Sequence, residues 1–497
     1  MIWRLPIALL LSVGLASALD LGTVPTGDCP FPDPWEPDFR LTRDPSWSYT
    51  PYNNARCIAC KPGGAVHVVW YDGRTGQCEI YHKRSTDNGA TWTADQRITN
   101  TSGNSDYPSV AVHDSFVHVV WMENDNGEWE VYYVRSTDYG ATWGEETPLT
   151  NAAEYQWFPC VAAAGNNVYT VWYDTRNGGN GEVYLRRSTD AGATWEPEAR
   201  LTNEPNSSCY ASVSAVDSLV HVVWSDTRTY FDIWYKRSTD YGATWTQDIQ
   251  LTTDPGASDF PASWTEGPDI YVVFDDNRAG NGEIFFKHSS DNGQSWSDDE
   301  RLTNAAGSSS SAEIMSSGDH LHVVWQDQRD GGSPEVYYKN SDDKGLTWKN
   351  DVRLTNDTAR SLLPCVAASD SAVHVVWEDT RDGNLEIYYK RNRRGNVGTE
   401  ETPSAERQTP NVGPTIVRGE LHLGVDSRQH SAYRAELLDA AGRKVLDLRA
   451  GANDVSRLAP GVYFIVEHPV VSSQYSGRTA VGGQRSTVFV RKVVVTE

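Results

Sequence analysis

Basic side chains are scarce in this chain of 497 residues, with 43 lysines and arginines against 67 acidic residues and only three methionines. The formal net charge of −24 creates a field that repels nucleic acid and anionic lipid headgroups, so we expect neither as a partner. An anionic sugar is still allowed, because a local arginine cluster acts within a Debye length of about 8–10 Å. The 19 tryptophans and 24 tyrosines favour an all-β fold, since aromatic rings pack well on pleated sheets.

Long apolar runs are missing too, and past the N-terminus no stretch approaches the roughly 18 residues of a membrane-spanning helix. The N-terminus has the pattern of a secretory signal. Arg4 is followed by an apolar or small stretch over 7–15 and by the small-residue cleavage pattern of 16–18. A buried N-terminal strand is the other interpretation. We expect residues 1–18 to be a signal peptide and the protein to be secreted or held at the cell surface.

Cysteine is also infrequent, and the seven residues are Cys29, Cys57, Cys60, Cys78, Cys160, Cys209 and Cys365. An exported protein permits disulfides, and an odd count leaves at least one thiol free or intermolecular. Cys57 and Cys60 have the spacing of half a zinc knuckle, but no second Cys or His pair follows at zinc spacing. We interpret them as structural or as partners of Cys29 or Cys78. The sequence predicts no metal site and no cofactor.

The most informative feature is an eight-residue segment, Ser-(Thr/Ser)-Asp-x-Gly-x-(Thr/Ser)-Trp, which recurs at intervals of 50 to 52 residues. The sixth copy, at 341–348, differs only in its second residue. Its glycine supplies a bend, its aspartate accepts local backbone N–H groups, and its tryptophan can fold back onto its own sheet, so we interpret the segment as structural. The aspartates and tryptophans are Asp87, Asp138, Asp190, Asp240, Asp291, Asp343, Trp92, Trp143, Trp195, Trp245, Trp296 and Trp348.

Each repeat predicts four strands, and the second of them, typified by Val-His-Val-Val-Trp at 66–70, occurs seven times. The seventh repeat lacks the eight-residue segment and the fourth strand, whereas an isolated fourth-strand sequence, Phe-Arg-Leu-Thr at 39–42, precedes the first repeat. We expect this N-terminal segment to complete the last sheet, which would remove the open edge of the array. The prediction is a seven-bladed β-propeller over residues 38–396, closed by an N-terminal outer strand.

The six segments resemble the Asp-box (BNR) repeats of the sialidase superfamily. The resemblance implies that the boxes lie on the outer rim, on the face opposite a ligand pocket. Sialidases use three arginines to hold the substrate carboxylate, a Tyr–Glu nucleophile pair and an acid/base aspartate. They have six blades and an early Phe-Arg-Ile-Pro motif, of which 39–42 matches only the first two residues. No catalytic residue can be carried over to this chain, and the same box occurs in propellers that are not enzymes.

The turns after the second strands contain a second repeated signal, Asp-x-Arg, which is replaced by Glu-Asn-Asp at 123–125 in the second repeat. In one interpretation each arginine pairs with the aspartate of its own turn or with the acidic residue that opens the third strand. In the other, the guanidinium groups form a ring that faces a carboxylated sugar. These candidate ligand-binding residues are Arg74, Arg176, Arg228, Arg278, Arg329 and Arg381.

The positions just before each first strand vary between repeats and supply a second group of candidates. Aromatic platforms beside polar groups suit sugar rings or peptide side chains, although the same rings could simply fill the central channel. The candidates are Arg56, Tyr107, Trp157, Phe158, Tyr210 and Phe260, with Ser311 and Leu363 at the equivalent places in the last two repeats. Histidines such as His67 and His118 recur on the second strand, which favours packing or cross-strand contact over a metal site.

Residues 397–414 are rich in Gly, Thr, Glu, Pro and Ser and are interpreted as a linker. Residues 415–497 then predict a small Ig-like β-sandwich. Gly-Arg-Lys-Val at 442–445, Pro-Gly-Val-Tyr-Phe at 460–464 and the terminal Lys-Val-Val resemble the C-terminal sorting domain of the type IX secretion system. That resemblance implies the secretion machinery as a partner. An adhesion domain of the same architecture is the other interpretation.

The function that we expect is therefore a secreted or cell-surface Asp-box propeller that binds a glycan or a protein on the face opposite the boxes. The alternative is an exo-α-sialidase-like glycoside hydrolase that acts on terminal sialic acids. The regularity of the repeats favours binding, because a catalytic site needs different residues from different blades.

Overall fold

The computed structural model describes residues 35–393, apart from 53–54, 62–63, 126, 229 and 370, and seven C-terminal stretches: 415–417, 420–423, 433–439, 443–448, 451–454, 461–469 and 489–495. The expected signal peptide and linker lie outside these residues. The described parts contain strands and turns but no helix, and hence no helix that could span a membrane. The chain divides into two compact units, 1–399 and 400–497.

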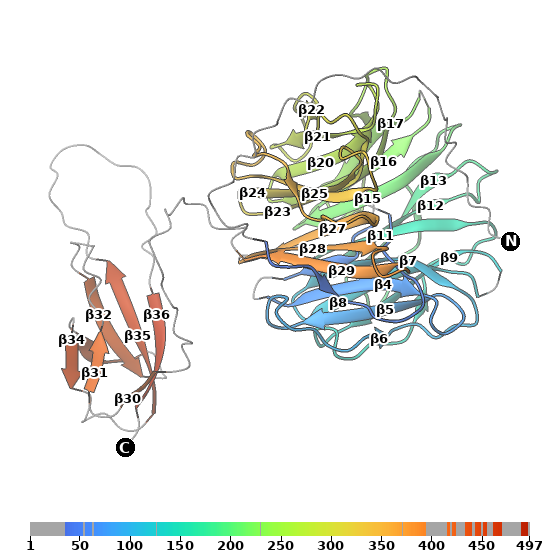
Figure 1. Cartoon of the computed structure of the whole chain (residues 1–497). Helices are drawn as coiled ribbons and strands as arrows, with labels where there is room; N and C mark the ends of the chain where they lie inside the picture. Colours follow the sequence, from blue (N-terminus) through green and yellow to red (C-terminus); the bar gives the residue numbers. More distant parts are fainter. Residues whose placement is uncertain are drawn as a thin grey trace, which may run out of the picture. The chain divides into compact units, whose positions relative to one another are not determined.

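Seven antiparallel sheets, the blades, form the first unit, and their inner strands neighbour one another in a closed ring (Figure 1). Six blades have four strands, whereas blade one has five because its inner strand is divided in two. The inner strands of blades one to seven are β2 (Ser48–Tyr49) with β3 (Ile58–Cys60), β7 (Ser105–His113), β11 (Gln156–Ala164), β15 (Ser208–Val216), β19 (Ser258–Glu266), β23 (Ser309–Ser317) and β27 (Ser361–Ser369). The prediction of a seven-bladed propeller is confirmed.

The second strands are the apolar centres of the blades. They are β4 (Val66–Asp72), β8 (Phe116–Glu123), β12 (Asn167–Asp174), β16 (Leu219–Asp226), β20 (Asp269–Asp276), β24 (His320–Asp327) and β28 (Ala372–Asp379). Both faces of each strand pack against neighbouring blades, so the alternating valines and the tryptophan of the repeat are all buried. The fully buried tryptophans are Trp70, Trp121, Trp172, Trp224, Trp325 and Trp377.

The third and fourth strands complete each blade towards the rim. The third strands are β5 (Glu79–Ser85), β9 (Glu130–Ser136), β13 (Glu182–Ser188), β17 (Asp232–Ser238), β21 (Glu283–Ser289), β25 (Glu335–Ser341) and β29 (Glu386–Asn392). The outer strands of blades one to six are β6 (Gln96–Arg97), β10 (Thr147–Pro148), β14 (Ala199–Arg200), β18 (Ile249–Gln250), β22 (Glu300–Arg301) and β26 (Val352–Arg353).

The outer strand of blade seven is β1 (Phe39–Arg40), which pairs with β29 and closes the ring as predicted. Its side chains repeat the contacts of an ordinary outer strand. Arg40 lies 2.6 Å from Glu386, and the hydroxyl of Thr42 donates to the same carboxylate at 2.5 Å. Within blade three the corresponding Arg200–Glu182 distance is also 2.6 Å. The N-terminal strand and the last blade, at opposite ends of the propeller sequence, are therefore joined by the same interactions that hold the outer strand of an ordinary blade.

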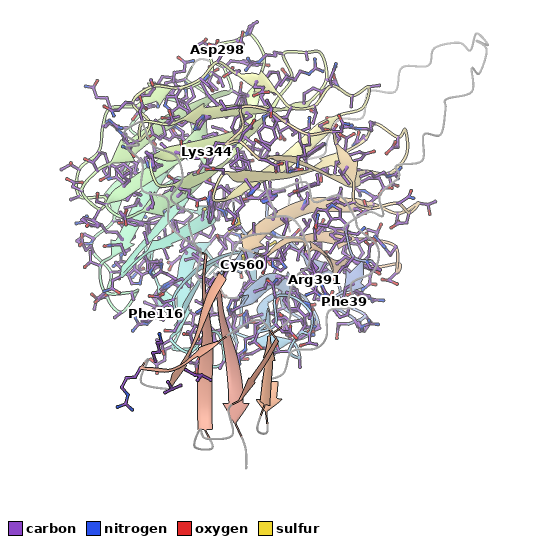
Figure 2. The ribbon with its side chains drawn as sticks, turned by 90° about the vertical axis from the view of Figure 1, so that its left-hand side faces the viewer. Phe39, Cys60, Phe116, Asp298, Lys344 and Arg391 are labelled. Atoms are coloured by element: carbon purple, nitrogen blue, oxygen red, sulfur yellow. The ribbon has the colours of Figure 1, made fainter. Side chains whose placement is uncertain are left out.

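Each Asp box links its blade to the preceding one. In blade three the Ser188 hydroxyl donates to Asp190 at 2.8 Å and accepts the N–H of Gly192 at 2.9 Å. Trp195 packs edge-on, at 4.8 Å between ring centroids, against Tyr133 of blade two. The expectation that this tryptophan folds back onto its own sheet is wrong for this contact, because the ring that it meets belongs to the neighbouring blade. Figure 2 views the propeller on the box face, where Cys60 and Lys344 are labelled.

The recurring histidines make cross-strand contacts, as the sequence predicts. The Nδ1 atom of His118 lies 2.7 Å from the hydroxyl of Tyr133 on the neighbouring strand, and His374 makes the same contact with Tyr389. Burial lowers the pKa of His118 to about 3, so this imidazole is neutral in the folded protein.

The second unit contains a sheet of five strands in the order β30-β36-β35-β32-β33 and a separate pair, β31–β34. Their bounds are β30 (Thr415–Val417), β31 (Glu420–Leu423), β32 (Tyr433–Asp439), β33 (Lys444–Leu448), β34 (Gly451–Asp454), β35 (Gly461–Pro469) and β36 (Phe489–Val495). Strand β30 runs parallel to β36, and the other pairs are antiparallel. The assignment to a sorting domain stays a prediction.

Candidate functional site

Strand register separates two faces of the propeller. In blade three, Gln156 and Glu182 both lie opposite Asp174 at one end of the sheet, whereas Ser188, which begins the Asp box, lies opposite Val168 at the other end. The starts of the first and third strands and the ends of the second strands therefore share the face opposite the boxes. The aromatic candidates, predicted to precede the first strands, instead lie within the first three residues of those strands, and so belong to this face: Tyr107, Trp157, Phe158, Tyr210 and Phe260.

A β-bulge near the start of each inner strand turns one residue of blades two to seven towards the axis. In blade three the register shifts between Trp157 and Cys160, and Phe158 within the shift has a φ of 55°. A left-handed φ is unfavourable for residues other than glycine, so its recurrence in six blades marks a constraint of the fold. The six residues are Tyr107, Phe158, Tyr210, Phe260, Ser311 and Leu363.

Side chains of the preceding blade hold several of the bulges in place. The N–H of Phe158 donates to the Met122 sulfur at 3.3 Å, and that of Leu363 donates to the Gln326 side-chain oxygen at 3.1 Å. The N–H of Ser311 donates to Asp275 at 3.0 Å. A position near the end of the second strand of blades two, four, five and six therefore supplies the acceptor for the next blade, which sequence reasoning did not identify.

Blade one replaces the bulge with a longer connection between β2 and β3, and this connection places Tyr52 over the axis. The Tyr52 ring lies 5.2 Å from Tyr107, 5.6 Å from Phe158 and 6.4 Å from Phe260, measured between centroids. Tyr210 lies 4.4 Å from Phe260. We call these five half-buried rings the axial cluster. Four of them are sequence-predicted candidates, whereas Tyr52 was missed, although the longer connection is visible in the sequence.

Arg56 lies buried beneath the axial cluster and crosses the channel. Its Nε is 3.3 Å from Glu313, its guanidinium donates to the carbonyl of Ser263, and it lies 4.8 Å from the centroid of Trp264. Burial raises the pKa of Glu313 to about 8, and the positive charge of Arg56 offsets part of that rise. Arg56 therefore has a carboxyl partner inside the protein.

The hydrogen-bonded pairing of β3 with β4 also corrects the sequence alignment of Arg56 with the bulge residues. The carbonyl of Cys57 accepts the N–H of Val69, as expected where Cys57 lies opposite Val69, and in blade two Ser109 lies opposite Val120. Arg56 thus corresponds to the residue after Tyr107, and the sequence alignment was wrong by one position.

On the box side of Arg56 the axis contains a small cavity of about 80 Å³. Small side chains such as Ala111 and Ala162 line most of it, with Trp264 and Met315. Arg56 and the axial cluster lie between this cavity and the opposite face.

The arginines of the Asp-x-Arg turns are each held within their own blade. Arg176 lies 2.5 Å from Asp174 and 2.5 Å from Glu198, and its guanidinium is 4.7 Å from the centroid of Tyr184. The same three kinds of partner occur for Arg74 with Asp72, Asp95 and Tyr81, for Arg228 with Asp226, Asp248 and Trp234, for Arg278 with Asp276, Asp299 and Phe285, for Arg329 with Asp327, Asp351 and Tyr337, and for Arg381 with Asp379, Asp38 and Tyr388. These contacts are those of the hairpin interpretation.

Among the described residues of this face, the cysteines contribute no disulfide. Cys57, Cys78, Cys160, Cys209 and Cys365 are free thiols, so Cys78 does not pair with Cys57. Cys29 lies outside the described residues. Within the part of the chain that the structure describes, no cluster of three or more His, Cys, Asp or Glu side chains has the geometry of a metal site.

Replacing Glu378 with glutamine is expected to raise the free energy of unfolding at pH 7.5 by roughly 2 kcal/mol and to change it little near pH 4.5. Burial raises the pKa of this carboxyl from 4.5 to about 8. The folded chain therefore keeps the proton to higher pH than the unfolded chain, and the wild-type protein loses stability between these two values as the pH rises. Urea unfolding at both pH values measures the effect, and the exposed Glu128→Gln is the control. An equal effect at both pH values would contradict the raised pKa of Glu378.

Comparison with known proteins agrees with this architecture. Residues 32–272 match the model of the BNR repeat-like domain, so the chain contains a BNR repeat domain. A xyloglucanase from Paenibacillus sp is 31% identical in a match that covers 22% of this chain and 12% of that protein. Among solved structures, a polysaccharide lyase of family PL25, an ulvan lyase, is similar with a TM-score of 0.50 and 11% identity, over 69% of this chain and 93% of that chain. The Hadza microbial sialidase Hz136 has a TM-score of 0.41 and 15% identity, over 66% of this chain and 73% of its own.

The chain spans about an eighth of the xyloglucanase that it matches, 12% of its length. At an identity of 11%, the likeness to the ulvan lyase shows a shared fold. Function must therefore be argued from the residues of this chain.

Proposed function

We propose that the protein binds a glycan on the face opposite the Asp boxes and does not cleave it. The observation that carries the proposal is the axial cluster, in which strained bulges and the longer connection of blade one bring five aromatic rings together at the end of the axis. Aromatic faces pack well against the apolar C–H faces of sugar rings, and neighbouring polar groups can accept sugar hydroxyls. A protein ligand is the other candidate for the same rings.

The contacts of the arginines favour binding over sialidase-like hydrolysis. A sialidase needs arginines that converge on one substrate carboxylate. In this protein the Asp-x-Arg guanidinium groups pair with carboxylates of their own blades, as Arg176 does with Asp174 and Glu198, and Arg56 pairs with Glu313. We expect no turnover of a fluorogenic sialoside by the mature protein. Turnover that is lost in both Arg176→Ala and Arg228→Ala would establish the alternative, an exo-α-sialidase-like hydrolase.

We also propose that the protein is secreted or held at the cell surface. Residues 1–18 would direct export as a signal peptide, and residues 397–414 would link the propeller to a sorting domain at 415–497 recognised by the type IX secretion machinery. The motifs in the sequence support this proposal. N-terminal sequencing of the exported protein tests it, with a mature start near residue 19 as the expected result and an intact N-terminus as the contrary one.

Replacing Trp157 with alanine is expected to weaken glycan binding by about 10- to 100-fold, equivalent to roughly 1.4–2.8 kcal/mol. Trp157 lies beside the axial cluster, 6.3 Å from Phe158 between centroids. Calorimetric titration with a panel of soluble polysaccharides measures the affinity. The control is Tyr241→Ala, which removes a 47% exposed ring from an Asp box on the other face and should leave affinity unchanged. Equal binding by both variants would contradict the proposed location.

A further inference from the structure

Two ladders of three aromatic rings stand on the face opposite the boxes, one in blade one and one in blade three. The first consists of Trp47, Tyr49 and Tyr71, and the second of Tyr155, Trp157 and Tyr173. In each ladder the lower two rings belong to residues that lie directly opposite each other on the inner and second strands, Tyr49 with Tyr71 and Trp157 with Tyr173. The outermost ring belongs in both cases to the residue two places before the inner-strand member.

The rings of each ladder stack face to face or at a tilt. Tyr49 and Tyr71 are 5.0 Å apart with 17° between their planes, and Trp47 lies 6.0 Å from Tyr49. In blade three, Tyr155 and Trp157 are 5.0 Å apart at 14°, and Trp157 and Tyr173 are 5.9 Å apart at 7°. The same three positions are therefore aromatic in two blades that are not consecutive along the chain.

The outermost rings are open to solvent. Trp47 is 48% exposed and Tyr155 is 38% exposed. A single exposed aromatic ring is ordinary on a protein surface. Two exposed rings at equivalent positions, each stacked on two further rings, form a repeated platform. Packing within the protein does not account for rings that stay exposed, so contact with a common ligand explains their repetition better.

The axial cluster joins the two ladders. Tyr71 lies 5.4 Å from Tyr107, Tyr107 lies 5.3 Å from Phe158, and Phe158 lies 6.3 Å from Trp157, all between centroids. A continuous series of rings thus runs from Trp47 to Tyr155. We call these seven residues (Trp47, Tyr49, Tyr71, Tyr107, Phe158, Trp157 and Tyr155) the aromatic stripe.

Blade two lies between the ladders and has polar side chains where they have rings. Its equivalents of the first two ladder positions are Asn104 and Asp106, as the pairing of Asp106 with Met122 on the second strand shows. The carboxyl group of Asp106 is hydrogen-bonded to the Cys78 thiol, and one of its oxygens is buried. Asn104 and Asp106 therefore make the surface between the two aromatic platforms polar, as suits contact with sugar hydroxyls.

The charges beside the stripe disfavour an anionic sugar. The carboxyl group of Asp106 faces this region, and the arginines of the same blades, Arg74 and Arg176, are each held by two carboxylates. The exposed Arg43 and Arg360, in the connections that lead into blades one and seven, oppose this effect, so an anionic polymer has to be tested beside neutral ones. The whole chain carries a net charge of −24, which adds to the repulsion.

We infer that the ligand is a neutral polysaccharide chain that contacts both ladders at once, rather than a terminal anionic sugar. The inference rests on the proposed function and specifies its ligand. Sugar rings at the two ends of a bound segment would stack on Trp47 and Tyr155, and rings between them would cover the stripe. Contact at two linked places makes affinity depend on chain length, because the second contact forms at a high effective concentration.

Calorimetric titration of the full-length mature protein tests this inference with four probes: soluble xyloglucan, galactomannan, a single xyloglucan oligosaccharide unit and polygalacturonate. We expect at least one neutral polymer to bind about tenfold or more tightly than the oligosaccharide unit, and polygalacturonate not to bind. Trp47→Ala and Tyr155→Ala should each weaken polymer binding by about tenfold and change oligosaccharide binding much less.

The control is Tyr230→Ala, which removes a 61% exposed ring outside the stripe and should bind like the wild type. Thermal unfolding of each variant establishes that it is folded, and these surface changes should leave the transition in place. Binding of polygalacturonate but of neither neutral polymer would overturn the inference while leaving glycan binding intact. Wild-type affinity in both ladder variants would overturn the two-ladder contact. Binding of none of the four probes would instead count against the proposed function itself.

Discussion

A chain that begins at residue 44 is expected to lose at least about 4 kcal/mol of unfolding free energy, a large part of the 5–15 kcal/mol typical of folded proteins. The truncation removes β1, the buried Leu41, and Arg40 and Thr42, which both bond to Glu386. Glu386 is completely buried and would keep only the hydrogen bond from Asn384 among its described side-chain partners, and an edge of blade seven would be opened. Urea unfolding followed by tryptophan fluorescence measures the loss.

A chain that begins at residue 34 is the control and should unfold like the full-length protein. A finer comparison uses Leu41→Ala and Leu201→Ala, which occupy the same place in the closing strand and in blade three and are 3% and 6% exposed. Both should cost about 2–5 kcal/mol, because each empties a similar buried space. If Leu41→Ala and the truncation at residue 44 both left the unfolding midpoint unchanged, closure by β1 would not support the ring.

The second large effect is expected for Gly192→Ala, which should destabilise the propeller by about 3 kcal/mol or more. Gly192 has a φ of 77°, and a methyl group at this position would overlap the hydroxyl of Tyr133 in blade two. That hydroxyl is held 2.7 Å from His118, so the tyrosine cannot move aside without breaking a buried contact. Thermal and urea unfolding measure the change.

Gly179→Ala is the matched control, because Gly179 has a φ of 91° but a methyl group there would meet nothing within 4 Å. It should cost only the roughly 1 kcal/mol of placing alanine in a left-handed conformation. Adding Tyr133→Phe to Gly192→Ala should recover part of the loss, since it removes the atom that the methyl group meets first. Equal losses in the two single variants would show that the close approach between blades is unimportant.

The architecture was predictable from the sequence because short local patterns of residues determine it. The alternation at 66–70 reports a buried strand, seven copies report seven blades, and the isolated 39–42 segment has no partner except the incomplete last repeat. These signals need only strand periodicity and turn chemistry. The C-terminal assignment rests on sequence motifs and stays a prediction.

The contacts between blades were harder to predict. Trp195 meets a ring of blade two and Phe158 bonds to Met122, and in both pairs the partners are tens of residues apart. A repeat pattern fixes which residues point out of a sheet, but not which neighbour they meet. The one-position error in the alignment of Arg56 has the same cause, because only the backbone hydrogen bond between Cys57 and Val69 sets the register of this segment.

The candidate site was predicted only in part. Tyr107 and Phe158 lie near the start of regular inner strands and were identified, whereas Tyr52 belongs to the connection where the repeat is interrupted. The ladder rings Trp47 and Tyr155 lie at positions that are polar in blade two, so they were not part of any repeated signal. The differences between blades at these positions arise from individual residues, and the periodicity of the sequence is uninformative about them.

The most direct test of a glycan-binding face opposite the Asp boxes is hydrogen–deuterium exchange of the protein with and without a bound neutral polysaccharide, read by mass spectrometry. We expect slower exchange in peptides that cover 47–52, 104–107 and 155–158, and unchanged exchange in the boxes at 85–92 and 188–195. Protection confined to the boxes, with the axial cluster and the ladders unaffected, would contradict the account.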